Sequence, residues 1–176
     1  PIEWDVDDES FRRQLESLKE YSQLAADLGC TRCLCTLAPA GDKRPYHENF
    51  EFHKRRFADI CQAMEPAGVR LGVGFRAADQ LRKEQAFQFI HSLDALLLLL
   101  NMVGAPNIGL LVDVWELALS AGSVEAIGHL SARQVVAVQL ADLPPDVPPA
   151  EITDQHRLLP SVEGKIDCVS VLATLA

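Results

Sequence analysis

The feature that most constrains the fold of this 176-residue chain is an alternation of two apolar patterns. Stretches whose apolar residues recur at helical spacing alternate with short runs that are apolar throughout. Continuous apolar runs are typical of strands in a parallel sheet that is covered on both faces. The sequence therefore predicts an α/β fold made of successive βα units.

The boundaries of these units follow from the patterns and from the glycines that end helices. We predict strands over residues 30–37, 69–75, 107–113 and 134–140. We predict helices over residues 7–28, 49–65 and 86–103, helical turns up to 130, and a last helix from about 167 after the proline-rich loop 141–165. Four strands fit an open doubly wound sheet or part of an eight-stranded barrel, and a complete barrel usually takes ~250 residues. We expect one domain, residues 1–176, with parallel strands that do not close a barrel alone.

The net charge and the length of the apolar runs argue against nucleic acids and membranes as partners. The formal net charge is −9, and the one small basic cluster, residues 54–56, is the pattern of a solvated helix face. Nucleic-acid binding, which needs a positive face, is disfavoured. No apolar run approaches the ~20 residues that cross a bilayer, so we expect no membrane association. The five cysteines and the absence of a signal-peptide pattern favour a cytoplasmic protein.

Polar residues at the ends of the predicted strands mark where a ligand would bind in a parallel α/β fold. These ends carry Thr36, Gly74 with Phe75, Asp113, and Gln139 with Asp142. The chain has neither a Walker loop nor a G-x-G-x-x-G or G-x-S-x-G motif. We therefore expect any chemistry to be found among these strand-end residues.

Asp113 and Glu116 permit two interpretations. Both carboxylates could face the strand ends and hold a hard divalent cation. Alternatively, Asp113 caps the following helix and Glu116 completes a capping box at its third position. The residues alone favour the capping role without excluding the cation site.

The cysteines and histidines give weaker signals. Cys30, Cys33 and Cys35 lack a second pair of ligands at a spacing that suits zinc, so we interpret them as small core residues. No histidine follows a predicted strand, and His53 and His91 fall on predicted helices. His47 and His156 lie in predicted loops that could reach over the strand ends, and they stay weak candidates for a base or metal ligand.

Several stretches resemble the xylose-isomerase-like sugar phosphate isomerases and epimerases. They are LGCTRC, ENFEFHKRRFADICQAMEPAGVRLGVGF, NIGLLVDVWELALSAG, VVAVQLADLP and RLLPSVEGKID. The resemblance covers nearly the whole chain. It implies the middle portion of a TIM-like (β/α) barrel, with further strands contributed from outside residues 1–176.

The resemblance also implies a divalent metal, bound by Glu, Asp, His and Glu at successive strand ends, that polarises a sugar carbonyl during enediol chemistry. Carried over to this chain, the first Glu falls at Gly74, the Asp is Asp113, and the His falls at Gln139. A substrate-binding His is replaced by Glu116, and Glu163 lies in the loop that precedes the last glutamate. Only Asp113 keeps its ligand chemistry among the three positions that this segment should supply.

Two functions remain open. The first is a divergent family member with impaired or lost metal-dependent catalysis, a pseudoenzyme that binds a metabolite or has a structural role. The alternative is an active Mg-, Mn- or Zn-dependent isomerase or epimerase with Asp113 and Glu163 as ligands. Glu116 is the candidate catalytic base in either an active metal enzyme or a metal-free one.

For a sugar or sugar phosphate we assign Phe75, Gln139, Asp142 and Arg157 as contacts. Open sheet edges predict a homo-oligomer or a partner that completes the barrel.

Overall fold

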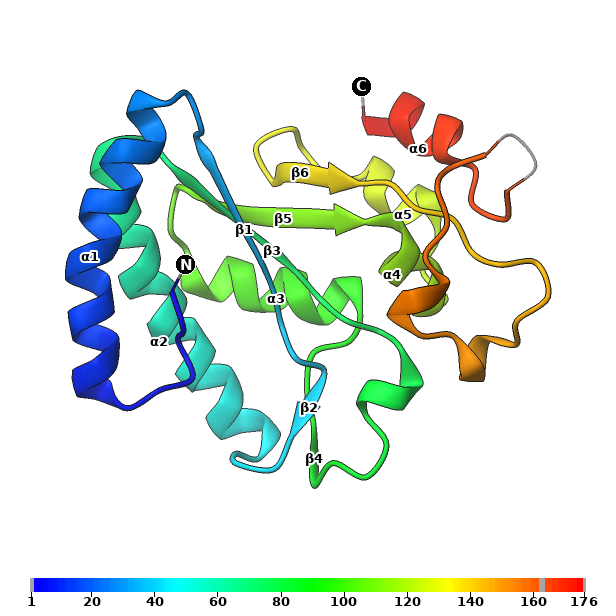
Figure 1. Ribbon diagram of the computed structural model, residues 1–176, viewed down its shortest axis with the longest axis horizontal. Helices are drawn as coiled ribbons and strands as arrows, with labels where there is room; N and C mark the ends of the chain where they lie inside the picture. Colours follow the sequence, from blue (N-terminus) through cyan, green and yellow to red (C-terminus); the bar gives the residue numbers. More distant parts are fainter. Residues whose placement is uncertain (1, 162–163, 176) are drawn as a thin grey trace.

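The computed structural model describes residues 2–161 and 164–175 and contains a parallel sheet whose strands are separated by helices (Figure 1). The strands pair in the order β1-β3-β5-β6. Their bounds are Arg32–Thr36 for β1, Arg70–Gly74 for β3, Ile108–Asp113 for β5 and Val135–Gln139 for β6. All three pairings are parallel, which confirms the predicted α/β architecture.

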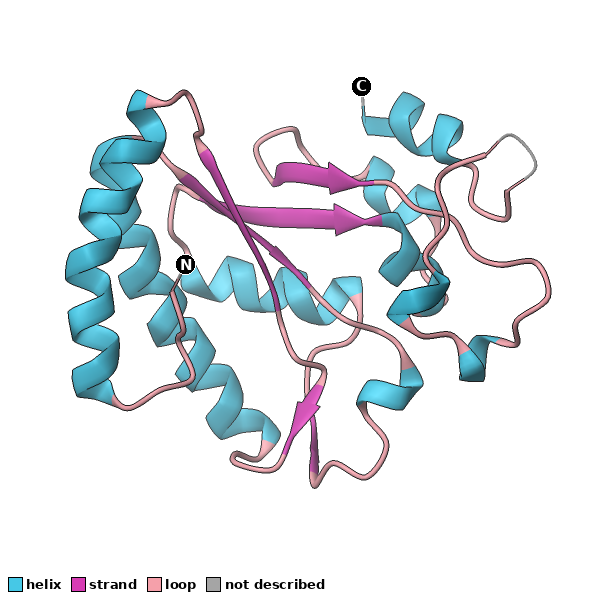
Figure 2. Cartoon of the chain, viewed as in Figure 1, coloured by secondary structure: helices cyan, strands magenta, loops and turns pink. Residues whose placement is uncertain are grey.

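One helix precedes β1 and the others follow strands, and the helices pack against the sheet (Figure 2). They are α1 (Asp8–Asp27), α2 (Tyr46–Met64), α3 (Leu93–Val103), α4 (Val114–Leu119), α5 (Val124–Gly128) and α6 (Cys168–Leu175). Short 3₁₀ helices cover Glu65–Ala67, Asp79–Leu81, Pro149–Glu151 and Asp154–His156. The side chains of Leu71 and Val73 on β3 are buried with the apolar faces of these helices in one core. Burial of these faces, rather than intrinsic propensity, is the main source of helix stability in such a layer.

Glycines on the other face of the sheet allow side chains of neighbouring strands to approach closely. Gly72 of β3 pairs with Gly109 of β5. A β-carbon at Gly72 would lie 2.7 Å from the Leu34 side chain and 3.1 Å from that of Val136, so side chains from β1 and β6 meet across it. The pairing of β5 with β6 also shifts register between Leu110 and Leu111. Glycine and bulges of this kind are how a sheet bends into a barrel wall.

One predicted helix begins later than its sequence suggests. The helix predicted over residues 86–103 starts at Leu93, and Phe87–Gln88 instead form strand β4, antiparallel to β2 (Ala40–Gly41). The Ala86 N–H donates to the Asp42 carboxylate at 2.8 Å, which fixes this turn. His91 consequently lies outside the helix on which we predicted it.

Two further expectations concern the cysteines and the membrane. Cys30 is exposed, so the interpretation of all three clustered cysteines as core residues is wrong for this one, because it precedes β1 instead of lying within the sheet. Within residues 2–161 and 164–175, none of the helices combines the length and the apolar character required of a bilayer span.

Candidate functional site

The site begins where β5 ends and α4 starts. Asp113 is the N-cap of α4, and its Oδ1 accepts the backbone N–H groups of Trp115 at 3.0 Å and Glu116 at 3.4 Å. This confirms the predicted capping role of Asp113. Its side chain is nevertheless in a position to take part in a site, because it lies at the carboxyl end of a central strand and is only 6% exposed.

Glu116 does not complete a capping box, because its carboxylate is directed to other donors. Its Oε2 accepts the backbone N–H of Ala77 at 2.7 Å, and its Oε1 accepts Nε of Arg76 at 2.8 Å. Both donors lie just beyond the end of β3, and Glu116 is 0% exposed. The side chain therefore ties the ends of two neighbouring strands together.

Arg157 joins the two carboxylates. Its Nη1 donates to both oxygens of Asp113, at 3.1 and 2.8 Å, and its Nη2 donates to Oε1 of Glu116 at 2.9 Å. The guanidinium carbon also lies 4.2 Å from the centre of the Trp115 ring. A planar group with several fixed donors suits this double contact, which a lysine could not reproduce.

A third carboxylate closes the network from a loop. Asp154, in the 3₁₀ helix Asp154–His156, forms an ion pair with Arg76, and its other oxygen is 3.8 Å from Nε of Arg157. A cavity of about 310 Å³ lies beside this pair and is lined by Arg76 and Asp154, with Gln80 and Thr153. Asp154 is the exposed member of the network, since 54% of its side chain is accessible to solvent.

The environment of Glu116 alters its acidity. Burial raises the pKa of the Glu116 carboxyl above its usual range, and the nearby Asp113 acts in the same direction. The N–H of Ala77 and the charges of Arg76 and Arg157 oppose that rise in pKa. A buried carboxyl with a raised pKa is a common feature of functional sites, although ion-pair networks also produce it.

The two substituted ligand positions lie on β3 and β6, the strands that flank β5. Gln139 on β6 is the register partner of Asp113, and Gly74 ends the neighbouring strand β3. A β-carbon at Gly74 would lie 3.3 Å from side-chain atoms of both Leu111 and Thr36, so a larger residue would require those neighbours to shift. Neither position carries the donor that the resemblance implies, because glycine has no side-chain ligand and Gln139 offers a neutral amide.

The remaining predicted contacts lie elsewhere. Phe75 is buried in the apolar core, and Asp142 accepts the N–H groups of Leu143 at 2.8 Å and Ile166 at 3.0 Å. Asp142 therefore holds the loop before α6 in place. Glu163 lies outside the described residues. Of the predicted site residues, the structure brings Asp113, Glu116 and Arg157 into direct contact and gives Phe75 and Asp142 packing and loop contacts.

Two members of the network were missed from the sequence. Both lie outside the strands and belong to no motif, so the contacts of Arg76 and Asp154 with this network depend on loop geometry. The signal that could have identified Arg76 is its place two residues after the end of β3, where a cationic group would face Glu116.

The donor set does not fit a divalent metal. In the part of the chain that the structure describes, no three His, Cys, Asp or Glu side chains are grouped so that they could hold a metal ion. Both oxygens of Asp113 accept Nη1 of Arg157, at 3.1 and 2.8 Å. The guanidinium of Arg157 and the N–H groups of Trp115 and Glu116 thus already take up acceptor positions of Asp113.

Comparisons with known proteins agree with this architecture. The family described as xylose isomerase-like TIM barrel matches residues 1–176. A xylose isomerase domain protein from Alicyclobacillus acidocaldarius is 28% identical with a TM-score of 0.89, over 99% of this chain and 61% of that protein. An IOLI protein with a bound zinc atom is 18% identical with a TM-score of 0.76, over 97% of this chain and 58% of that one.

A structure of L-ribulose 3-epimerase is 17% identical with a TM-score of 0.64, over 97% of this chain and 52% of the epimerase. No curated protein matched. The chain thus spans between about half and three-fifths of the length of these structures. From the match over its whole length and its parallel βα architecture, this chain belongs to the family of xylose isomerase-like TIM barrels.

Proposed function

We propose that this member of a sugar isomerase- and epimerase-like family has impaired or lost metal-dependent catalysis and acts as a metabolite-binding pseudoenzyme. The observation that carries the proposal is the double contact of Arg157 with Asp113 and Glu116. A fixed internal cation compensates the charge of two buried carboxylates, which would otherwise be costly to bury. The protein then has no need of a metal ion to stabilise this part of the fold.

The substituted positions support the same proposal. A glycine at position 74 has no ligand atom, and the amide of Gln139 is a neutral, weak donor for a transition metal. The two positions lie on different strands, and both strands keep their parallel pairing. Loss of ligand chemistry with retention of the scaffold is the pattern expected when binding or assembly, rather than catalysis, is under selection.

The proposed ligand is a sugar phosphate bound in the cavity beside Arg76. Asp154 is exposed and contributes a carboxylate from a loop, so a phosphate group could take its place on Arg76 without disturbing Glu116. A phosphate would form charge-assisted hydrogen bonds like those that Asp154 forms. The sugar hydroxyls would then face Gln80 and Thr153, which line the same cavity.

Metal analysis of the full-length protein tests the proposal. After incubation with Mn²⁺, Zn²⁺ and Mg²⁺ and removal of free ions, we expect far less than one bound ion per chain, with no difference between the wild type and Asp113→Asn. Ribose 5-phosphate should raise the melting temperature, and Arg76→Gln should remove that rise, whereas ribose without the phosphate should have a smaller effect. Stoichiometric metal that Asp113→Asn abolishes would contradict the proposal.

That contradicting result would instead support an active isomerase or epimerase. One observation favours this second candidate: Glu116 is a buried carboxyl with a raised pKa, which suits a general base for proton transfer next to a carbonyl. In that case Asp113 and Glu163 would hold the metal together with ligands from outside residues 1–176. Glu116→Gln would then abolish turnover while metal binding persists.

A further inference from the structure

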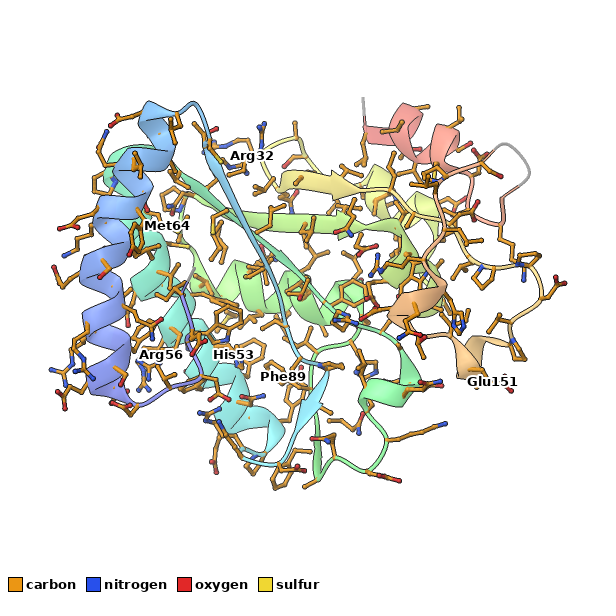
Figure 3. All side chains as sticks on the ribbon, viewed as in Figure 1. Arg32, His53, Arg56, Met64, Phe89 and Glu151 are labelled. Atoms are coloured by element: carbon orange, nitrogen blue, oxygen red, sulfur yellow. The ribbon has the colours of Figure 1, made fainter. Side chains whose placement is uncertain are left out.

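The loop between β6 and α6 carries two of the charged side chains that form the network at the end of β5. Figure 3 shows this loop beyond the carboxyl ends of β5 and β6, with Glu151 labelled. Asp154 and Arg157, the two charged members, lie within one short segment, residues 153–157. Whatever fixes this segment therefore also fixes the loop side of the network.

A reciprocal cap holds the segment in place. The hydroxyl oxygen of Thr153 accepts the backbone N–H of His156, and Nδ1 of His156 accepts the backbone N–H of Thr153 at 3.0 Å. The second acceptor of such a capping box is usually the side-chain oxygen of a glutamate or glutamine. Here it is an imidazole nitrogen, which accepts a hydrogen bond only while it carries no proton.

The geometry decides which form of the imidazole can make the cap. A backbone N–H can only donate, so Nδ1 must carry a lone pair, and the proton of the neutral ring lies on Nε2. The Thr153 hydroxyl, 3.3 Å from Nδ1, can turn to donate or to accept, whereas the backbone N–H cannot. A second proton would enter on Nδ1 and set two donors against each other. The complete cap therefore requires neutral His156.

Charged groups surround the capped segment on several elements. They are Arg76, Asp79, Arg82, Asp113, Glu116 and Glu151 on the neighbouring elements, and Asp154 and Arg157 in the segment itself. Most of these groups form ion pairs with one another, and among the described residues none is paired with the imidazole of His156. A proton on His156 would add a positive charge next to Arg157 in the chain and would remove the cap at the same time.

We propose that the cap formed by Thr153 and His156 is a proton-sensitive latch, a contact that holds residues 153–157 over the strand ends only while the imidazole is neutral. Histidine is the side chain whose charge ordinarily changes between about pH 5 and pH 8, so mild acidification opens the latch. Release of the segment loosens Asp154, which lines the cavity beside Arg76. The latch goes beyond the proposed function, because the cap itself needs neither a metal nor a ligand.

Hydrogen exchange at the Thr153 amide tests the latch, because this N–H is the donor of the cap. Exchange in ¹⁵N-labelled full-length protein is followed by NMR at about pH 8 and about pH 5.5, on either side of the ordinary histidine transition. The protection factor corrects each rate for the intrinsic pH dependence of exchange. We expect the protection factor of Thr153 to be roughly fivefold to tenfold smaller at the lower pH, as for the loss of one hydrogen bond.

Substitutions of His156 supply the two end states of the latch. In His156→Gln a side-chain oxygen accepts the Thr153 N–H at both pH values, so the protection factor should not change with pH. His156→Ala has no acceptor, and its protection factor should be small at both pH values. His129→Gln, which changes an exposed histidine outside the loop, should behave like the wild type.

The Trp115 indole shows whether opening of the latch reaches the network, because its ring lies 4.2 Å from the guanidinium carbon of Arg157. Its N–H resonance should shift with pH in the wild type and not in His156→Gln. A protection factor of Thr153 that is constant in the wild type, or that falls equally in His156→Gln, overturns the proposal. A Trp115 resonance that behaves alike in the two proteins overturns it as well. These measurements contain no metal and no phosphate, so failure of the latch is distinguishable from failure of the proposed function.

Discussion

The ends of β5 and β1 occupy equivalent places in the architecture and use their polar groups in opposite ways. At the end of β5, two guanidinium groups and three carboxylates bind one another, and the two most buried carboxylates share Arg157. At the end of β1, the imidazole of His53 is held by packing and by one backbone contact, and its second nitrogen is unpaired among the described residues. The charged groups of the first region pair with one another, whereas the second region leaves one nitrogen of His53 without a partner among the described residues.

This difference shows that a strand end is not a binding site by position alone. A parallel sheet collects polar side chains at its carboxyl edge, but loop residues decide whether those side chains face a ligand or one another. Arg157 arrives from a loop 44 residues after Asp113 and uses the oxygens that a metal ion would need. No comparable side chain from the described residues reaches Nε2 of His53.

The largest effect should come from removing Arg157. Arg157→Ala leaves Asp113 and Glu116, 6% and 0% exposed, without their shared cation. We expect the free energy of unfolding to fall by about 3 kcal/mol, because an uncompensated buried charge is costly. Urea denaturation measures the change, and Arg55→Ala, which removes an exposed guanidinium, serves as the control. Equal changes in the free energy of unfolding would show that Arg157 does not compensate the charges of Asp113 and Glu116.

A smaller loss is expected when only Glu116 is changed. Glu116→Gln keeps the shape but turns one accepting oxygen into a donor amide, which meets either the Ala77 N–H or the arginines. Mispairing of a buried group should lower the free energy of unfolding by about 2 kcal/mol. The exposed Glu20 provides the matched substitution, Glu20→Gln, which should be neutral. If neither substitution changed the free energy of unfolding, the hydrogen bonds of Glu116 with Ala77, Arg76 and Arg157 would not contribute to stability as described.

The smallest effect concerns the pH dependence of stability at the end of β1. Burial lowers the pKa of His53 from 6.5, a change that Arg44 reinforces and that Asp5 and the Asn49 carbonyl oppose. The stabilisation by neutral His53 is therefore complete above pH 6.5 and is lost as the pH falls through the lowered pKa. A difference of one bound proton changes the free energy of unfolding by at most about 1.4 kcal/mol per pH unit.

Urea denaturation of the wild type and of His53→Phe between neutral and mildly acidic pH separates this contribution from that of the other histidines. As the pH falls, we expect the free energy of unfolding of the wild type to decrease more than that of His53→Phe. If the free energies of unfolding of the two proteins changed equally with pH, the imidazole would not be held in its neutral form. The contrast between the two strand ends would then weaken.

Much of the fold could be predicted because its patterns are local. The strands and the long helices coincide with apolar runs and helical periodicity, and Asp113 was recognised both as an N-cap and as a strand-end residue. The antiparallel pair of Ala40–Gly41 with Phe87–Gln88 could not be predicted, because contacts across 44 residues fix it, such as that of Asp42 with Ala86. Phe89 and Ile90 are apolar enough to continue a helix, yet they are buried in the segment before α3.

The candidate site was harder to predict than the fold. The pairing of Asp113 with Glu116 follows from their spacing, but the contact of each with Arg157 depends on how a proline-rich loop returns to the strand ends. His53 had no strand-end signal at all, since it lies on α2. Its burial against Phe89 results from the unpredicted course of the chain before α3.

The chain contains two tryptophans, and each belongs to one of these regions. Trp115 is fully buried beneath the Arg157 guanidinium, and its indole N–H lacks a hydrogen-bond partner among the described residues. Trp4 is half-buried and, together with His53, lines a cavity of about 290 Å³ beyond the end of β1. Each strand end therefore carries its own fluorophore, one shielded from water and one partly hydrated. With Trp4→Phe or Trp115→Phe as single-emitter proteins, intrinsic emission can report on the two strand ends separately.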